Sequence, residues 1–169
     1  IELCLAIAVL GCILCASRVL APPASNRATA KDSSAQPVEQ YNVAFDSPSR
    51  DFHGAMPLGN GDIGISTWVE ENGDLLFYIG KTDAYDDNNR LLKLGLVRVK
   101  LTPNPVSPAA PYRQELKLGS GEFVIQAGEE DAYVTLRLWV DANQPVIHVG
   151  ALGQKPFDVR VSLEPWRTQ

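Results

Sequence analysis

The sequence predicts an all-β protein, a β-sandwich, from three observations. Apolar and polar residues alternate with a period of two in several short runs, most clearly from Val134 to Val140. Such alternation places every second side chain of a strand in the core. Turns rich in Gly, Pro and Asn separate the runs by about 8–12 residues, which is a spacing typical of a sandwich. No long stretch of the sequence has the periodicity of an α-helix.

Residues 1–21 have the pattern of a secretory signal peptide whose basic first part is missing. From Leu3 to Leu14 almost every residue is apolar, and small residues follow at Ala16 and Ala21, as around the cleavage site of such a peptide. The apolar run is shorter than the roughly 20 residues that cross a bilayer. We therefore expect a cleavable leader and a secreted or periplasmic protein. Cys12 leaves lipoprotein processing as the weaker alternative.

Two further segments follow the predicted leader. Residues 22–40 are rich in Pro, Ala, Ser and Thr. Such a stretch buries too little apolar area to offset the entropy lost on ordering, so we expect a flexible linker. Residues 41–169 are enough for one domain. A strand-like run continues almost to Gln169, so we expect a supersandwich-like domain that is truncated at its C-terminus.

The composition argues against several classes of partner. All three cysteines lie in the predicted leader, so the mature domain has neither a disulfide framework nor a thiolate metal site. The net charge of −5 argues against nucleic acid, which requires a clustered Lys and Arg surface. No basic amphipathic stretch indicates a membrane surface as partner. We expect neither nucleic acid nor, apart from the leader, a membrane as partner.

The predicted strands follow one another along the domain. Ile63–Val69 and Leu75–Ile79 flank Asn72-Gly73. This order predicts a hairpin with a type I′ turn, in which both central residues need positive φ. Further strands are expected over Leu94–Leu101, Val134–Val140, Val146–Val149 and Phe157–Leu163. The best helical candidate is Asp87–Leu94, where Asp or Asn would cap one or two turns.

Four segments occur in order between residues 57 and 95. They are Pro57-Leu58-Gly59-Asn60-Gly61-Asp62-Ile63-Gly64, Leu76-Phe77-Tyr78-Ile79, Lys81-Thr82-Asp83-Ala84-Tyr85 and Asn89-Arg90-Leu91-Leu92-Lys93-Leu94-Gly95. This series resembles the N-terminal β-sandwich of a bacterial glycoside-hydrolase-like family, domain of unknown function 5703. That family is similar in style to glycoside hydrolase family 95, the α-L-fucosidases. The resemblance covers Val43–Trp166.

The resemblance implies that the chemistry takes place outside this chain. In the resembled family an (α/α)6 barrel follows the sandwich and carries the catalytic carboxylates. The resemblance therefore implies a chain without catalytic residues that braces a barrel and lends one loop to the rim of its active site. The implied partner is an oligosaccharide or polysaccharide. A free-standing carbohydrate-binding or adhesion module, or an envelope domain that makes only protein contacts, is the alternative.

The polar segment from Lys81 to Arg90 is the expected contact with a sugar. Strands are predicted on both sides, and sugar hydroxyls need several donors and acceptors held in fixed positions. The candidate substrate-binding residues are Lys81, Asp83, Tyr85, Asp86, Asn89 and Arg90. In the alternative interpretation, the acidic residues satisfy turn amides and the basic residues pair with them at the surface.

The glycine motif at the start of this region has a structural interpretation. Gly59, Gly61 and Gly64 match the spacing of a dinucleotide fingerprint, but a strand follows them where that fingerprint requires a helix. We therefore expect the three glycines to permit a tight turn and close backbone packing. The aromatic residues Trp68 and Tyr78 are expected in the core or on a sheet face, and Trp139 is a further candidate for contact with a sugar.

No metal or cofactor is expected. Asp83, Asp86 and Asp87 offer oxygen ligands for Ca²⁺, which stays an alternative, but they lack the spacing of an EF-hand loop. His148 lies inside an apolar run and is expected to be a hydrogen-bonded strand residue. Without another histidine or a suitably spaced acid near it in the sequence, we do not expect a zinc site.

Overall fold

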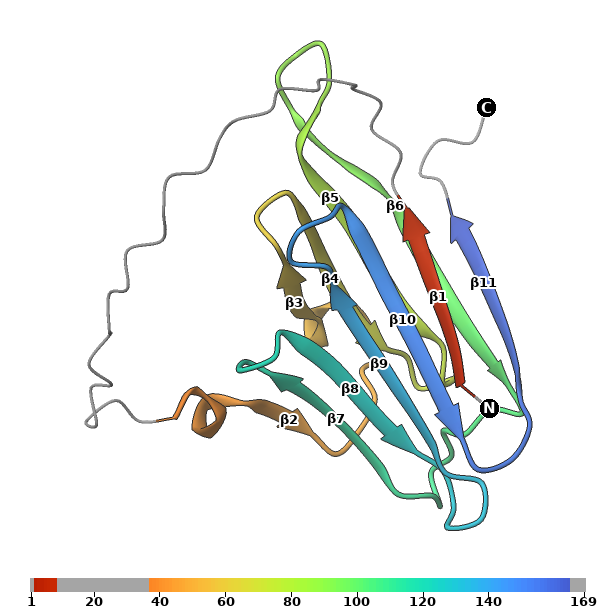
Figure 1. The fold of residues 1–169 in the computed structure, drawn as a ribbon. Coiled ribbons are helices and arrows are strands. Elements are labelled where there is room, and N and C mark those ends of the chain that lie inside the picture. Colours follow the sequence, from red (N-terminus) through yellow and green to blue (C-terminus); the bar gives the residue numbers. More distant parts are fainter. Residues whose placement is uncertain (1, 9–36, 165–169) are drawn as a thin grey trace, which may run out of the picture.

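The computed structural model describes residues 2–8 and 37–164. Most of the predicted leader and linker, including Cys12, and the aromatic residue Trp166 lie outside the described residues. Within the described residues, eleven strands form two antiparallel sheets that pack face to face (Figure 1). The predicted all-β sandwich is confirmed.

The two sheets differ in size. The larger has the strand order β1-β10-β9-β8-β7-β2, with bounds β1 Glu2–Ala8, β10 Val146–Gly153, β9 Val134–Val140, β8 Glu122–Ala127, β7 Tyr112–Lys117 and β2 Val43–Phe45. The smaller has the order β11-β6-β5-β4-β3, with bounds β11 Asp158–Glu164, β6 Leu91–Thr102, β5 Leu75–Tyr85, β4 Ile63–Val69 and β3 Met56–Gly59. Two short 3-10 helices, η1 (Val38–Tyr41) and η2 (Phe52–Gly54), precede β2 and β3.

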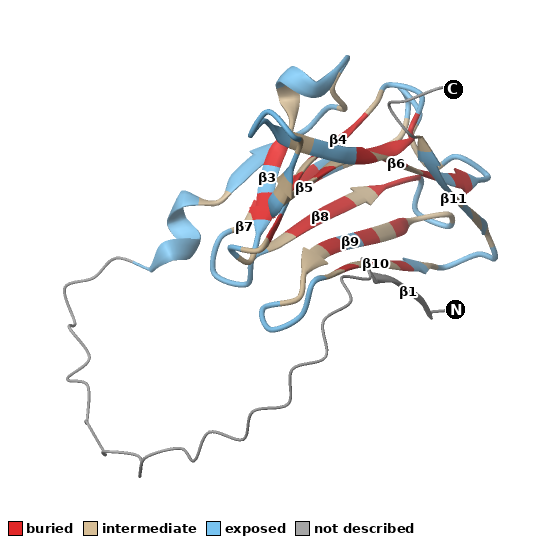
Figure 2. Ribbon diagram, turned by 90° about the horizontal axis from the view of Figure 1, so that it is seen from above, coloured by how far each residue is buried: buried red, intermediate tan, exposed pale blue. Residues whose placement is uncertain are grey.

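The core fills the space between the sheets. Phe77 of β5 and Phe123 of β8 are fully buried there. In β9 the side chains of Val134, Leu136 and Leu138 face the core, and the residues between them face outward, as the period-two pattern predicts. Figure 2 shows this alternation of buried and less buried residues along several strands. Each such aliphatic side chain contributes about 2 kcal/mol of hydrophobic stabilisation when fully buried.

The strands agree with the sequence pattern in part. β4 and β9 have the predicted bounds, whereas β5 and β6 are longer and pair as far as Tyr85 and Leu91. The predicted helix over Asp87–Leu94 is wrong, because residues 91–94 belong to β6. A helix of one or two turns is unstable by itself, whereas Leu91 and Lys93 pair with Tyr85 and Gly80 of β5.

The β4–β5 turn corrects the predicted turn type. Of the two residues in Asn72-Gly73, only Gly73 has a positive φ, of 85°. The Gly73 N–H donates to the Glu70 carbonyl at 2.8 Å, and the Glu70 N–H donates to the Asp74 carbonyl at 3.0 Å. This arrangement matches a type I turn followed by a bulge with Gly in the left-handed region. The side chain of Asn72 accepts from the Asp74 N–H at 2.9 Å.

The N-terminal strand β1 lies at the edge of the larger sheet. It pairs antiparallel with β10 over seven residues, from Glu2 opposite Leu152 to Ala8 opposite Val146. These residues belong to the predicted leader, whose assignment over residues 1–21 stays a prediction. Among the described residues, no helix is long and apolar enough to cross a membrane.

Candidate functional site

Three turns meet at one end of the sandwich. They are the β3–β4 turn around Asn60, the β9–β10 turn that begins at Asp141, and the base of the β5–β6 hairpin at Lys81. The side chain of Asn60 joins the first two. Its amide donates to the carbonyls of Asp141 at 2.7 Å and Gln144 at 3.2 Å. Its oxygen accepts from the N–H groups of Asp62 at 2.9 Å and Ile63 at 2.8 Å. One side chain therefore fixes its own turn and links the two sheets.

Lys81 holds the hairpin base to the β3–β4 turn. Its ammonium lies 2.6 Å from Asp83 and 3.1 Å from Asp62. The bond to Asp83, followed by the bond to Asp62, holds the pKa of the Lys81 ammonium above its usual value. The same ammonium holds the pKa of the Asp83 carboxyl below its usual value. Thr82 adds two bonds to Asp62, one from its N–H and one from its hydroxyl.

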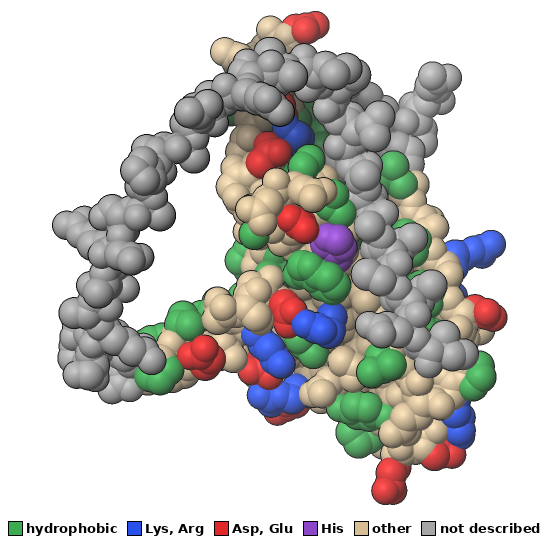
Figure 3. Space-filling view, in the orientation of Figure 1, with side chains coloured by type: hydrophobic (Ala, Val, Ile, Leu, Met, Phe, Trp, Pro, Cys, Tyr) green, Lys and Arg blue, Asp and Glu red, His purple; other side chains and the backbone are tan. Residues whose placement is uncertain are grey.

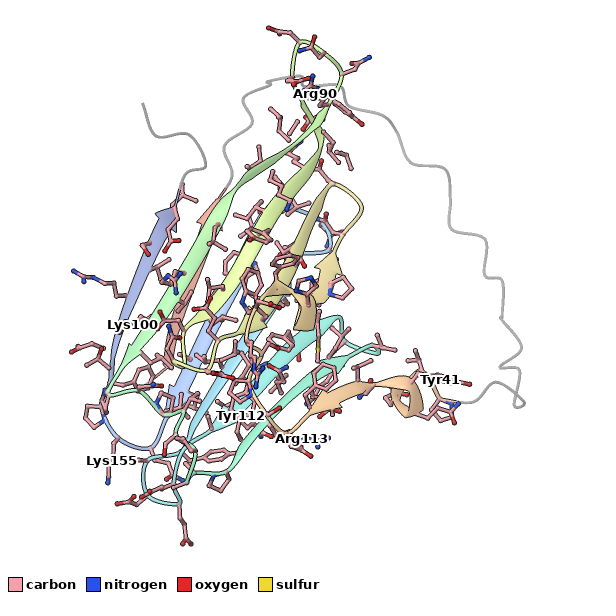
Figure 4. The ribbon with its side chains drawn as sticks, turned by 180° about the vertical axis from the view of Figure 1, so that it is seen from behind. Tyr41, Arg90, Lys100, Tyr112, Arg113 and Lys155 are labelled. Atoms are coloured by element: carbon pink, nitrogen blue, oxygen red, sulfur yellow. The ribbon has the colours of Figure 1, made fainter. Side chains whose placement is uncertain are left out.

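Beyond Lys81 the β5–β6 hairpin leaves the sheet. β4 pairs with β5 only as far as Lys81, and β11 pairs with β6 only as far as Leu96. Residues 81–92, which we call the hairpin arm, begin at the last residue that pairs with β4 and stand out past the body of the sandwich (Figure 1). Arg90 lies near the tip of the arm (Figure 4).

The side chain of Asp86 closes the tip of the hairpin arm. One of its carboxylate oxygens accepts from the N–H groups of Asn88 at 2.9 Å and Arg90 at 2.8 Å. Asn89 has a φ of 60°, a left-handed conformation that asparagine tolerates better than most residues. Asp86 and Asn89 therefore shape the turn, which is the structural alternative considered for the acidic residues.

The six predicted site residues fall into separate groups along the arm. Lys81 and Asp83 pair at its base, and Asp86 with Asn89 form its tip. Tyr85 is 54% exposed. The Arg90 side chain forms no ion pair within the described residues. The structure therefore places the six residues on one projecting element and not around one pocket.

Residues 44–169 match the family DUF5703_N, described as a domain of unknown function (DUF5703). The chain belongs to this family. No curated protein matches the chain.

The DUF5703 motif that begins at Pro57 spans the end of β3, a turn and the start of β4. Residues 57–59 lie on β3, Asn60 to Asp62 form the turn, and Ile63 and Gly64 open β4. The turn residue Gly61 has a φ of 93°, a conformation that glycine adopts without strain. The middle of the motif therefore builds the turn, as expected from its glycines. We call the end of this DUF5703 domain where Asn60, Lys81 and Asp141 lie the polar end.

The outer face of the larger sheet carries a cluster that the sequence did not predict. The rings of Trp139 and His148 stack with centroids 4.8 Å apart and planes 11° from parallel, and Arg137 lies over Trp139 at 5.6 Å. His148 Nε2 lies 3.5 Å from Asp141. The N–H of Asn143, and then His148, lower the pKa of the Asp141 carboxyl. Figure 3 views this side and shows charged and hydrophobic side chains interspersed on it.

The pairing of β9 with β10 brings the residues of this cluster together. Trp139 and His148 lie directly opposite each other on β9 and β10, although nine positions separate them in the sequence. A period-two pattern places both outward but does not give the register between two strands.

An ionic cluster around Arg98 holds parts of the DUF5703 domain together. Arg98 of β6 contacts Glu164 at 2.7 Å, Asp74 at 3.0 Å and Glu70 at 3.2 Å. It joins the start of the β4–β5 turn to the edge strand β11. These contacts, that with Glu164 first, raise the pKa of the Arg98 guanidinium further above its already high value. In residues 37–164 no group of three His, Cys, Asp or Glu side chains is arranged to hold a metal ion, and Asp86 is engaged in its turn.

Proposed function

We propose that this chain is the N-terminal, non-catalytic sandwich of an exported glycoside-hydrolase-like protein. It braces a helical barrel and places the hairpin arm at the rim of the sugar-binding site. The observation that supports this proposal is the arm itself. It projects past both neighbouring strands while Lys81 fixes its base and Asp86 fixes its tip.

The arm has the properties of a contact element. Tyr85 and Leu91 lie opposite each other on its two strands and are 54% and 60% exposed. Exposed apolar side chains on one element mark a surface for another protein or a ligand. Arg90 adds guanidinium donors that form no ion pair within the described residues, and these donors suit sugar hydroxyls. Because its two ends are fixed, the arm would lose little entropy on binding.

The carboxylates at the polar end do not suit glycosidic chemistry. Hydrolysis of a glycoside needs one carboxylic acid with a raised pKa and one free carboxylate. Asp62 and Asp83 share the Lys81 ammonium within 3.1 Å, and the pKa of Asp83 is lowered. Asp83 is therefore a poor proton donor. The pairing of both carboxylates with Lys81 supports a non-catalytic role for the chain and a catalytic centre elsewhere in the parent protein.

A free-standing carbohydrate-binding module is the second candidate. It is favoured by the Trp139 and His148 cluster, because an aromatic ring on an open sheet face suits the apolar face of a sugar. Trp139 already stacks on His148 and lies under Arg137, so less of its ring is available to a ligand. The hairpin arm therefore supports the role in a glycoside-hydrolase-like protein more strongly than this cluster supports a free-standing binding module.

The test uses the full-length protein that contains this domain and a panel of aryl glycosides and polysaccharides. Arg90→Ala and Tyr85→Ala are expected to lower kcat/KM about tenfold or more on the substrate that is turned over, with an unchanged melting temperature. Arg50→Ala is the control, because Arg50 lies outside the arm, is exposed and pairs with Glu71 at 3.4 Å. Equal turnover in all three variants would remove the arm from the active-site rim. Hydrolysis by the 169-residue chain alone would show that the domain is catalytic.

A further inference from the structure

A groove of about 420 Å³ runs along the outer face of the smaller sheet. Figure 4 is viewed from this side of the molecule. The floor of the groove is the backbone of β4 and β5, where Gly64 and Gly80 lie directly opposite each other. Its walls carry five side chains that are not fully buried, those of Phe52, Pro57, Ser66, Tyr78 and Lys93. This groove lies on the opposite side of the molecule from the Trp139 and His148 cluster.

The fold requires two of the three glycines in the motif. A Cβ atom at Gly59 would lie 2.8 Å from the Ile63 carbonyl oxygen, and Gly61 has a φ of 93°. A Cβ atom at Gly64 would meet no heavy atom within 4 Å, and its φ lies outside the left-handed region. Glycine inside a strand weakens the strand. No contact within the described residues therefore accounts for glycine at position 64.

Gly80 extends the same bare surface onto the next strand. A Cβ atom there would meet only the Gly64 carbonyl oxygen, at 3.8 Å. Gly80 also stands at an irregularity of the β5–β6 pairing, where glycine is common. Gly64 lies in regular pairing with both of its neighbours. Interior strand glycines without a packing role mark places where a ligand or another backbone approaches closely.

The walls combine aromatic rings with polar groups. The Tyr78 ring lies 5.0 Å from the Trp68 ring and 4.5 Å from the Lys93 ammonium. Phe52 is 52% exposed and stacks on His53 at 4.3 Å. The buried indole N–H of Trp68 has no hydrogen-bond partner in the described residues. Lys93 is the one charged residue of the groove lining.

We propose that the groove binds a sugar ring of a glycan, which lies flat on the backbone of Gly64 and Gly80. The C–H face of the ring packs against Phe52 and the edge of Tyr78. Its oxygens accept from Lys93 and bond to the Ser66 hydroxyl. The choice of a sugar over another flat ligand rests on the proposed function. Two aromatic rings, a hydroxyl and an ammonium suit a sugar ring, which has an apolar face and polar edges.

The experiment fills the groove without removing any contact. Gly64→Val and Gly80→Val add side chains over open space at positions without positive φ, so the variants are expected to fold, which their melting temperatures check. Thr135→Val is the control on the other sheet, because Thr135 faces outward from β9 and does not belong to the Trp139 and His148 cluster. Migration of the full chain is measured in gels that contain neutral glucans, mannans or xylans, or the uronate polymers polygalacturonate and alginate.

Retardation by at least one polysaccharide is expected for wild type and Thr135→Val. Both valine variants are expected to raise the dissociation constant at least tenfold. Lys93→Met should weaken binding more for a uronate polymer than for a neutral one. Equal retardation of wild type and filled variants would overturn the groove and leave the hairpin arm as the sugar contact. Retardation of none of the proteins would also overturn it, while the turnover test of Arg90 and Tyr85 would still decide the proposed function.

Discussion

The amide of Asn60 and the carbonyl of Asp141 form a 2.7 Å hydrogen bond across 81 positions of sequence. The bond joins a turn of the smaller sheet to a turn of the larger one. Sandwich layers are otherwise held together by non-directional apolar contacts, so a directional bond at one end fixes how the two sheets are aligned. This bond is therefore expected to make the polar end rigid, and its contribution to stability can be measured.

Asn60→Ala is expected to lower the free energy of unfolding by about 2–3 kcal/mol, because it removes two donated and two accepted hydrogen bonds. The control is Asn72→Ala, since within residues 37–164 the Asn72 side chain bonds only to Glu70 and Asp74 of its own turn. That variant is expected to lose about 1 kcal/mol. Urea unfolding monitored by tryptophan fluorescence measures both. Equal losses would show that the link between the sheets adds nothing.

Arg98→Leu is expected to lower the free energy of unfolding by about 2 kcal/mol. The change leaves the Asp74 carboxylate, whose side chain is only 10% exposed, without its cation. Arg50→Leu removes a pair between side chains that are 90% and 68% exposed, and such pairs contribute about 0–1 kcal/mol. Denaturant midpoints of the two variants make the comparison. A loss as small for Arg98 as for Arg50 would contradict the structural role of the cluster.

The Lys81 pairs predict a pH window for stability. The pKa of Asp83 is lowered in the folded chain, so its contribution is present above the ordinary value of 3.8 and is lost as the pH falls through the lower folded value. The pKa of Lys81 is raised, so its contribution is present below 10.5 and is lost as the pH rises further.

The difference in melting temperature between wild type and Lys81→Met measures this window. It is expected to be largest between about pH 5 and 9 and to shrink on both sides. Lys100→Met is the control, because Lys100 forms no ion pair within residues 37–164. A difference for Lys81→Met that stays constant from pH 3 to 11 would count against the two ion pairs.

Gly64→Ala is expected to raise the free energy of unfolding by about 0.5–1 kcal/mol, because the unfolded chain loses freedom and the fold loses no contact. Gly59→Ala and Gly61→Ala are expected to lower it, the first by a clash with the Ile63 carbonyl and the second by its positive φ. Thermal unfolding of the three variants gives the order. Destabilisation by Gly64→Ala would mean that position 64 serves packing after all.

The sequence predicted the strands whose pattern is regular. Val134–Val140 alternates cleanly, and β9 has those bounds. The pattern was less informative for β3, because the four residues Met56–Gly59 read as the start of a glycine-rich turn. The hairpin arm was mistaken for a loop with a helical turn, since its polar residues gave no alternation. Pairing with β6 extends β5 to Tyr85 regardless of polarity.

In the candidate site, only contacts between residues that are close in the sequence could be predicted. Lys81 and Asp83 lie two positions apart, on one side of a strand, and their pairing follows from the sequence. Asp62 and Asp141 reach the site through sheet register and sandwich alignment. These long-range relations depend on how the sheets close, which no local pattern encodes.

The predicted leader would give strand β1 two roles that exclude each other. While residues 2–8 pair with β10 they are part of a sheet, and during the predicted export the same residues would be extended in a translocation channel. Removal of the leader would leave the β10 backbone from Val146 to Leu152 as an open edge, prone to pair with other chains. The amides of β10 would then exchange slowly in molecules that keep the leader and fast in molecules from which it has been removed. Amide hydrogen exchange along β10 would therefore distinguish the two forms.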